Sequence, residues 1–174
     1  MRLALRLLSL PLVAAAAAAL PAAASGVPVS TSFTVVGYEY AFTSTIGSFA
    51  GTGIGNAGGT AYWNATVRHD RLGSTPTWVN GGPFAMAVRG PGSAVDAVVG
   101  KFSHHGGKIT TLDRGANCTN QKYLVADTIA AVSTPTTANG TGNFRVTLTH
   151  YRHRFLGRCV AYKARVSGVV SFTY

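Results

Sequence analysis

One segment near the C-terminus changes its chemical character along a single face. The even positions between residues 142 and 154 are apolar first and basic afterwards: Phe144, Val146, Leu148, His150, Arg152 and Arg154. Because alternate residues of a β-strand share a face, an apolar inward face would become cationic near one rim. In a hairpin closed by residues 155–158, Tyr162 would lie opposite His150 or Arg152. These three side chains could orient an anionic or carbonyl-bearing ligand, unless this end of the strand is simply solvated.

Two carboxylates interrupt apolar strand patterns elsewhere in the chain. Glu39 follows Phe33 and Val35 on one face, and Asp127 lies between Val125 and Ile129. A carboxylate removed from water must be paired or lose its charge, and His150 or Arg152 could pair with it. Glu39, Asp127 and His150 are therefore candidate catalytic residues for proton transfer or cyclisation. The alternative is a buried ion pair with a purely structural role.

Other catalytic classes lack their motifs. The sequence contains no Gly-x-Ser-x-Gly elbow and no His-Glu-x-x-His, and Gly107-Lys108 leads into a strand and not into a phosphate-binding helix. We expect His104-His105 to lie in a glycine-rich surface turn. No pattern predicts a metal site or a cofactor.

The first 25 residues have the features of a secretory signal peptide. Arg2 and Arg6 precede an apolar run from residue 7 to 20, and Ala22 to Ala24 supply small residues for cleavage. An apolar run of this length, with a proline inside it, is too short for a membrane anchor. We therefore expect a secreted protein with no transmembrane segment and a single mature domain over residues 26–174.

Secretion determines how the two cysteines are interpreted. Cys118 and Cys159 are the only two in the chain. An even count in an oxidising compartment predicts a disulfide, and no further ligands flank them as a metal site would require.

The mature chain alternates apolar and polar residues, with glycine and proline between the runs. The predicted strands are 32–42, 47–54, 58–69, 82–90, 94–103, 107–112, 122–133, 142–154 and 159–173. Short links imply antiparallel pairing, because parallel crossovers need about a dozen residues. The long final hairpin favours a single all-β, antiparallel, up-and-down barrel of eight or nine strands, with a β-sandwich as the alternative.

Three glycine- and phenylalanine-containing segments suggest a family resemblance. Residues 47–53, residues 99–109 and residues 140–144 with the long strand after them resemble the hairpins of the allene oxide cyclase and dirigent barrels. The resemblance implies an apolar barrel cavity that holds a small hydrophobic substrate, with cofactor-free cyclisation in some members. No complete catalytic motif of either family is present, so the resemblance implies no functional residue.

The positive net charge of the mature chain indicates which classes of partner it could bind. Without the signal peptide, 13 Lys and Arg face five acids, and many of the cations fall between Arg145 and Arg165. Such a region attracts acidic polysaccharides or anionic lipid surfaces, although a basic surface can also serve solubility alone. We do not expect nucleic acid as a partner, because no reader motif is present.

Three functions follow from these patterns. The first is a non-enzymatic binder of a small apolar or amphiphilic ligand inside the barrel, with Trp63 lining the cavity and His150, Arg152 and Tyr162 orienting the ligand. The second is a cofactor-independent cyclase or isomerase that uses Glu39 or Asp127 with His150. The third is an envelope- or polyanion-binding protein that works through its basic outer face. The oligomeric state and the identity of the ligand do not follow from the sequence.

Overall fold

The computed structural model describes residues 30–90, 97–134 and 137–174. The predicted signal peptide lies outside these residues. No helix in the described ranges is long and apolar enough to cross a membrane.

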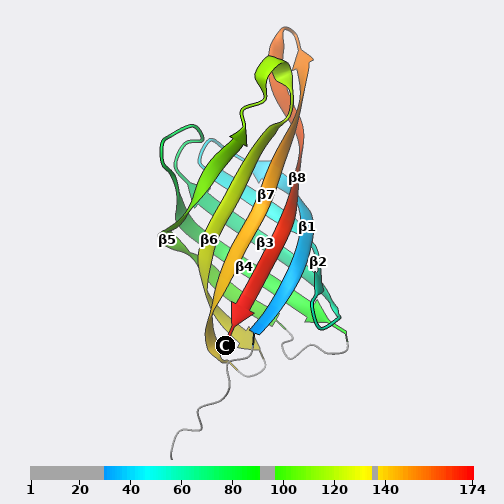
Figure 1. Cartoon of the computed structure of the whole chain (residues 1–174), viewed down its shortest axis with the longest axis vertical. Coiled ribbons are helices and arrows are strands. Elements are labelled where there is room, and N and C mark those ends of the chain that lie inside the picture. The colour runs from blue at the N-terminus through cyan, green and yellow to red at the C-terminus, as the bar shows by residue number, and fades with distance from the viewer. Residues whose placement is uncertain (1–29, 91–96, 135–136) are drawn as a thin grey trace, which may run out of the picture.

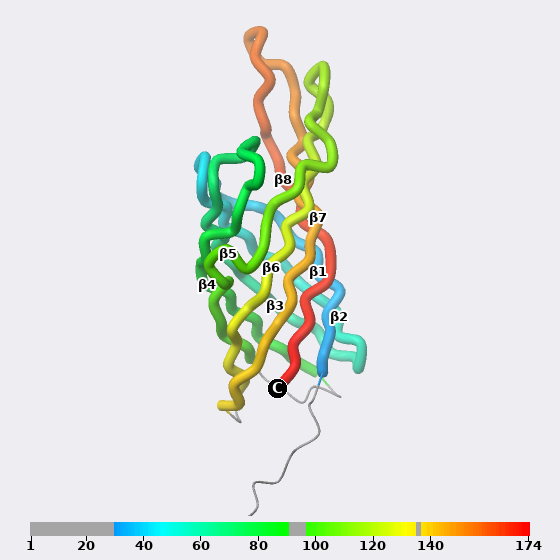
Figure 2. Tube along the Cα trace, turned by 60° about the vertical axis from the view of Figure 1, so that its left-hand side comes forward, coloured from blue at the N-terminus to red at the C-terminus, as the bar shows by residue number. Residues whose placement is uncertain are grey.

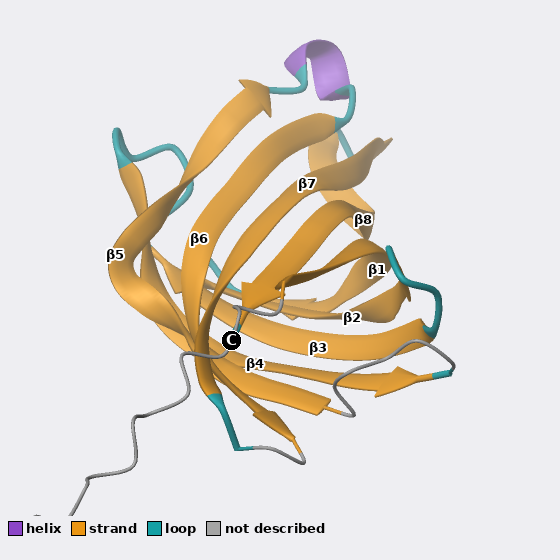
Figure 3. Cartoon of the chain, turned by 60° about the horizontal axis from the view of Figure 1, so that its bottom comes forward, coloured by secondary structure: helices purple, strands orange, loops and turns teal. Residues whose placement is uncertain are grey.

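Eight antiparallel strands form one closed barrel in sequential order (Figures 1 and 3). The strands are β1 (Ser30–Phe42), β2 (Ile46–Gly55), β3 (Thr60–His69), β4 (Thr77–Arg89), β5 (Ala97–Asp113), β6 (Gln121–Thr134), β7 (Asn139–Phe155) and β8 (Arg158–Thr173). The barrel closes where β1 pairs with β8, with Phe33 opposite Val170. The predicted up-and-down barrel is confirmed, and the structure is not a sandwich.

The fifth strand accounts for the difference between nine predicted segments and eight strands. Residues 97–103 of the first segment and the whole of segment 107–112 belong to one strand, β5, and residues 94–96 lie outside the described ranges. The predicted turn at His104-His105 is wrong: the chain bulges there, and pairing with β6 passes from Phe102 directly to Lys108. A positive φ of 56° at His105 accommodates the extra residues without ending the strand.

The barrel interior is filled by side chains from alternate strand positions. Its largest fully buried members include Phe84, Phe144 and Phe172. The Phe144 ring lies 5.1 Å from the ring of Phe102 and 6.1 Å from that of Trp63, both in edge-to-face geometry. Such packing excludes water and stabilises the barrel without help from helices.

Two inward-facing glycines make room for the largest core side chain. A Cβ at Gly37 would lie 2.9 Å from the Trp63 indole, and a Cβ at Gly51 would lie 2.8 Å from its Nε1. The indole therefore occupies space that side chains on β1 and β2 would fill, and its Nε1 donates a hydrogen bond to the Thr52 carbonyl at 3.2 Å.

The predicted disulfide between Cys118 and Cys159 is confirmed. It links the short 3-10 turn Ala116–Cys118, between β5 and β6, to the beginning of β8. The β7–β8 hairpin and the β5–β6 connection both extend beyond the barrel at the same end (Figure 2), and the disulfide joins these two extensions.

Candidate functional site

A buried carboxylate–imidazole pair lies near one end of the barrel. His150 Nε2 and Glu39 Oε2 are 2.9 Å apart, and their side chains are 10% and 4% exposed. The residues are 111 positions apart in sequence. They meet because β8 pairs with β7 on one side, with Ala164 opposite His150, and with β1 on the other. The structure therefore brings together two of the three candidate catalytic residues.

The surroundings of this pair are apolar and tightly packed. The rings of Phe42 and Tyr123 lie 6.0 and 5.6 Å from the His150 ring. A cavity of about 40 Å³ borders Glu39 and His150, with Phe49 and Leu148 also in its walls. This volume suits a water molecule or two, whereas pockets for small organic ligands measure roughly 300 to 1,000 Å³. Chemistry on a substrate at this pair would require the barrel end to open.

Asp127 does not join the pair. It lies opposite Phe144 on β7, whereas His150 lies opposite Gln121, so six residues separate the two positions along the ladder. At the rise of a β-strand this separation is about 20 Å. The predicted combination of Asp127 with His150 is therefore wrong, because the register places them at different levels of the barrel.

Asp127 instead lies at the interruption of the β5–β6 ladder. Its Oδ1 accepts a hydrogen bond from the Thr128 backbone N–H at 2.7 Å, while Oδ2 is buried and meets no hydrogen-bond partner within the described residues. Burial raises the pKa of the Asp127 carboxyl to about 6, against the opposing effect of the Thr128 hydrogen bond. A groove of about 470 Å³ is lined by Asp127 together with Lys108 and Arg145.

The three predicted ligand-binding residues do not line a common cavity. Trp63 is 2% exposed and packs within the core. Arg152 donates a hydrogen bond from Nη1 to the Gly115 carbonyl at 3.2 Å and so ties β7 to the β5–β6 connection. Tyr162 is 61% exposed, and its ring contacts that of His153.

The predicted pairing of Tyr162 opposite His150 or Arg152 is wrong. The partners of those residues are Ala164 and Ala161, and the register shifts between Tyr151 and Arg152. Tyr162 is the extra residue of this bulge, and a one-residue shift moves a side chain to the other face of a strand. It therefore points to solvent and not to the barrel mouth.

A basic groove on the outer face of the barrel was not predicted from the sequence. It measures about 660 Å³ and crosses β7, β8, β1 and β2. Its side chains include two tyrosines, Tyr38 and Tyr151, two cations, Lys163 and Arg165, and the hydroxyls of Thr52, Thr149 and Ser167. No carboxylate lines it. Arg165 lies opposite Tyr38 only because β8 closes on β1, so the alternation within each strand does not reveal the cluster.

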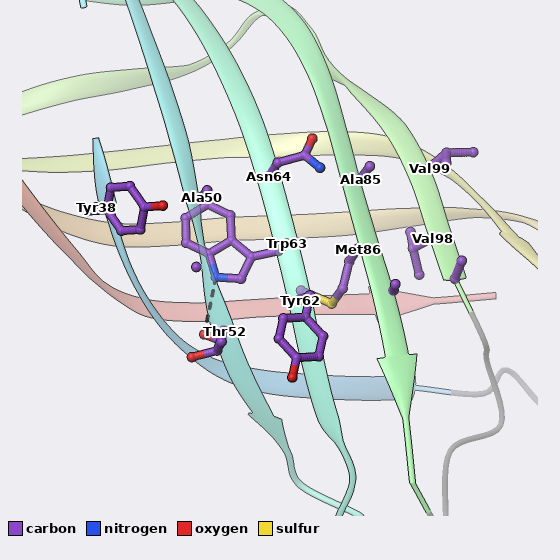
Figure 4. Close-up of a pocket in the computed structure, with 13 residues that line it drawn as sticks. Tyr38, Ala50, Thr52, Tyr62, Trp63, Asn64, Ala85, Met86, Val98 and Val99 are labelled. Atoms are coloured by element: carbon purple, nitrogen blue, oxygen red, sulfur yellow. Dashed lines mark hydrogen bonds between the residues drawn. The ribbon is translucent and has the colours of Figure 1, made fainter. Parts of the chain in front are cut away.

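A second groove adjoins the basic groove on the outer face (Figure 4). It measures about 560 Å³ and shares Tyr38, Gly51 and Thr52 with the basic groove. Tyr62 and Asn64 border it, and the rest of its lining combines small side chains, such as Ala50 and Ala85, with the larger Trp63 and Met86. We call it the neutral groove, because its lining contains no charged side chain.

Comparisons with known proteins identify no relative. No family model, no curated protein and no solved structure matches this chain. The resemblance to the allene oxide cyclase and dirigent barrels therefore stays a prediction. Within the described ranges, no group of three or more His, Cys, Asp or Glu side chains could hold a metal ion.

Proposed function

We propose that this protein is secreted and binds an acidic polysaccharide in the basic groove. The observation that carries the proposal is the combination of Tyr38, Tyr151, Lys163 and Arg165 in one groove of about 660 Å³ without a carboxylate in its lining. The Cys118–Cys159 disulfide is compatible with an oxidising, extracellular location.

The cations in the groove are available to a ligand. Among the described residues, no Asp or Glu carboxylate lies within ion-pair distance of Lys163 or Arg165, so neither cation is neutralised there. A guanidinium forms bidentate, charge-assisted hydrogen bonds with a carboxylate, and an ammonium group adds a point charge. Both match the carboxylates of a polymer of uronic acids.

The remaining side chains suit the uncharged parts of a sugar. Tyr38 is 54% exposed, and an exposed tyrosine offers an apolar ring for packing together with a phenolic hydroxyl. Threonine and serine hydroxyls donate and accept hydrogen bonds, as sugar hydroxyls do. The neutral groove continues this surface beyond Tyr38, with Tyr62 and the Asn64 amide as further contacts (Figure 4). A polymer chain that leaves the basic groove could therefore extend along it.

The binding of polygalacturonate, measured by titration calorimetry, tests the proposal. Replacing Lys163 and Arg165 by serine should weaken binding about tenfold or more, because charge-assisted hydrogen bonds contribute more than neutral ones. Replacing Arg154 and Arg158 by serine removes the same charge from the hairpin tip and should change binding little. Neutral dextran should bind neither variant nor the wild type. Equal losses in the two variants would show that only overall charge attracts the polymer and would overturn the proposal.

The two interior functions stay predictions. The Glu39–His150 pair is the observation that favours the cofactor-independent isomerase as a second candidate, since it places a carboxylate within hydrogen-bond distance of an imidazole. The isomerase would be favoured over polysaccharide binding if a Glu39→Gln variant failed to convert a substrate that the Lys163→Ser/Arg165→Ser variant still converts.

A further inference from the structure

The β7–β8 hairpin continues beyond the rest of the barrel. β6 follows β7 as far as Gln121 opposite His150, and β1 follows β8 as far as Tyr38 opposite Arg165. From there to the turn the two strands pair only with each other, ending at Phe155 opposite Arg158. Five residues of β7 beyond His150 correspond to a projection of about 17 Å. The tip lies at the end of the molecule opposite the C-terminus (Figures 1 and 2).

The projecting hairpin is braced. An isolated two-stranded hairpin is only marginally stable in water. Here the Cys118–Cys159 disulfide joins it to the β5–β6 connection, and Arg152 donates a hydrogen bond to the Gly115 carbonyl of that connection. The structure therefore holds the tip in a fixed position away from the barrel.

The turn at the tip presents two large apolar side chains to solvent. Phe155 is 58% exposed and Leu156 is 88% exposed. The central residues Leu156 and Gly157 both have positive φ, 47° and 76°, as a two-residue type I′ turn requires. Asparagine is the favoured residue at the first of these positions, and a bulky side chain there is an outlier. The leucine therefore does not stabilise the turn, and its side chain packs against little of the protein.

The charges around these side chains are positive. Arg154 and Arg158 flank the turn and are exposed. No carboxylate lies between residues 128 and 174, so no acidic side chain of the hairpin opposes them. Apolar side chains at the extremity with arginines directly behind them match the order of layers at an anionic lipid surface, where acyl chains lie below the charged headgroups.

We propose that the β7–β8 tip docks on an anionic lipid surface, with Phe155 and Leu156 entering the acyl layer and Arg154 and Arg158 contacting headgroups. This surface is separate from the two grooves, so the proposal is independent of polysaccharide binding. The basic groove reaches Tyr151 and Lys163 at the base of the hairpin, so a protein bound in this way would hold the groove behind the tip and away from the acyl layer.

Vesicle sedimentation with three variants tests the docking. Wild-type protein should sediment with vesicles of equimolar phosphatidylglycerol and phosphatidylcholine and remain free of vesicles of phosphatidylcholine alone. Phe155→Ser/Leu156→Asn should lose binding about tenfold or more. Arg154→Ser/Arg158→Ser should lose about 30-fold at about 0.1 M salt, from a contribution of about 1 kcal/mol per arginine. Ile54→Asn, which replaces an exposed apolar residue far from the tip, should bind as the wild type does.

The design separates loss of docking from loss of folding. Asparagine adopts positive φ more readily than leucine, so the tip variant should keep its melting temperature. It should also bind polygalacturonate as the wild type does, while Lys163→Ser/Arg165→Ser should still bind vesicles. Wild-type sedimentation of Phe155→Ser/Leu156→Asn would overturn the proposal. Loss of vesicle binding in the arginine variant alone would show electrostatic attraction without insertion of the apolar side chains, and this result would overturn the proposal as well.

Discussion

Replacing Asp127 by asparagine removes a buried charge and leaves the hydrogen bond from the Thr128 N–H possible. Burial raises the pKa of the Asp127 carboxyl from 3.8 to about 6. The folded protein therefore holds a proton between these pH values that the unfolded chain releases, and the wild type loses stability as the pH rises through this window. Two pKa units correspond to about 3 kcal/mol, and solvent in the adjoining groove reduces this to about 2 kcal/mol.

Urea unfolding followed by tryptophan fluorescence at two pH values measures this effect. The free energy of unfolding of Asp127→Asn, relative to that of the wild type, should be about 2 kcal/mol higher at about pH 7.5 than at about pH 3.5. The increase should occur between the two pKa values of the Asp127 carboxyl. Any cost of leaving the new amide nitrogen without a partner is the same at both pH values and cancels in the comparison. A stability difference between variant and wild type that does not change with pH would refute the reasoning, since it would mean that the carboxylate is solvated in the folded state.

Two further changes test the packing and the covalent bracing of the barrel. Gly51→Ala should cost about 3 kcal/mol of stability or more, because the new Cβ would clash with the Val36 carbonyl oxygen and would also lie 2.8 Å from Trp63 Nε1; an unchanged urea midpoint would contradict this packing. Replacing Cys118 and Cys159 together by serine should lower the free energy of unfolding by up to about 4 kcal/mol, since the disulfide closes a separation of 41 residues. The double-serine variant should unfold at the same urea midpoint as the reduced wild type and at a lower midpoint than the oxidised wild type.

Local patterns in the sequence were sufficient to predict most of the strands and the disulfide. Alternation of apolar and polar residues depends only on the geometry of a single strand, so it predicts which residues form β7 and β8 without knowledge of their neighbours. The pairing of Cys118 with Cys159 needed no geometry, because no other cysteine is present. A buried carboxylate needs a partner, and Glu39 does pair with His150.

The errors arose at bulges and where the register between two strands decides which residues lie close together. Tyr162 points outward because of a bulge, and Asp127 is separated from His150 by the register of β6 against β7. The His104-His105 segment continues a strand because its extra residues bulge out of the ladder and the chain does not turn there. Such irregularities depend on the pairing of distant strands, and the alternation within one strand carries no information about them.

The sequence by itself determined that the chain would form antiparallel strands around an apolar face, because that property belongs to each segment separately. Only the tertiary structure decided which polar residues share a site. Closure of β8 on β1 placed Arg165 beside Tyr38 and formed the basic groove. Packing around Trp63 and Phe144 determined how much of the interior is filled. Both outcomes depend on contacts between residues far apart in the chain, and the free energy of those contacts exists only once the barrel has closed.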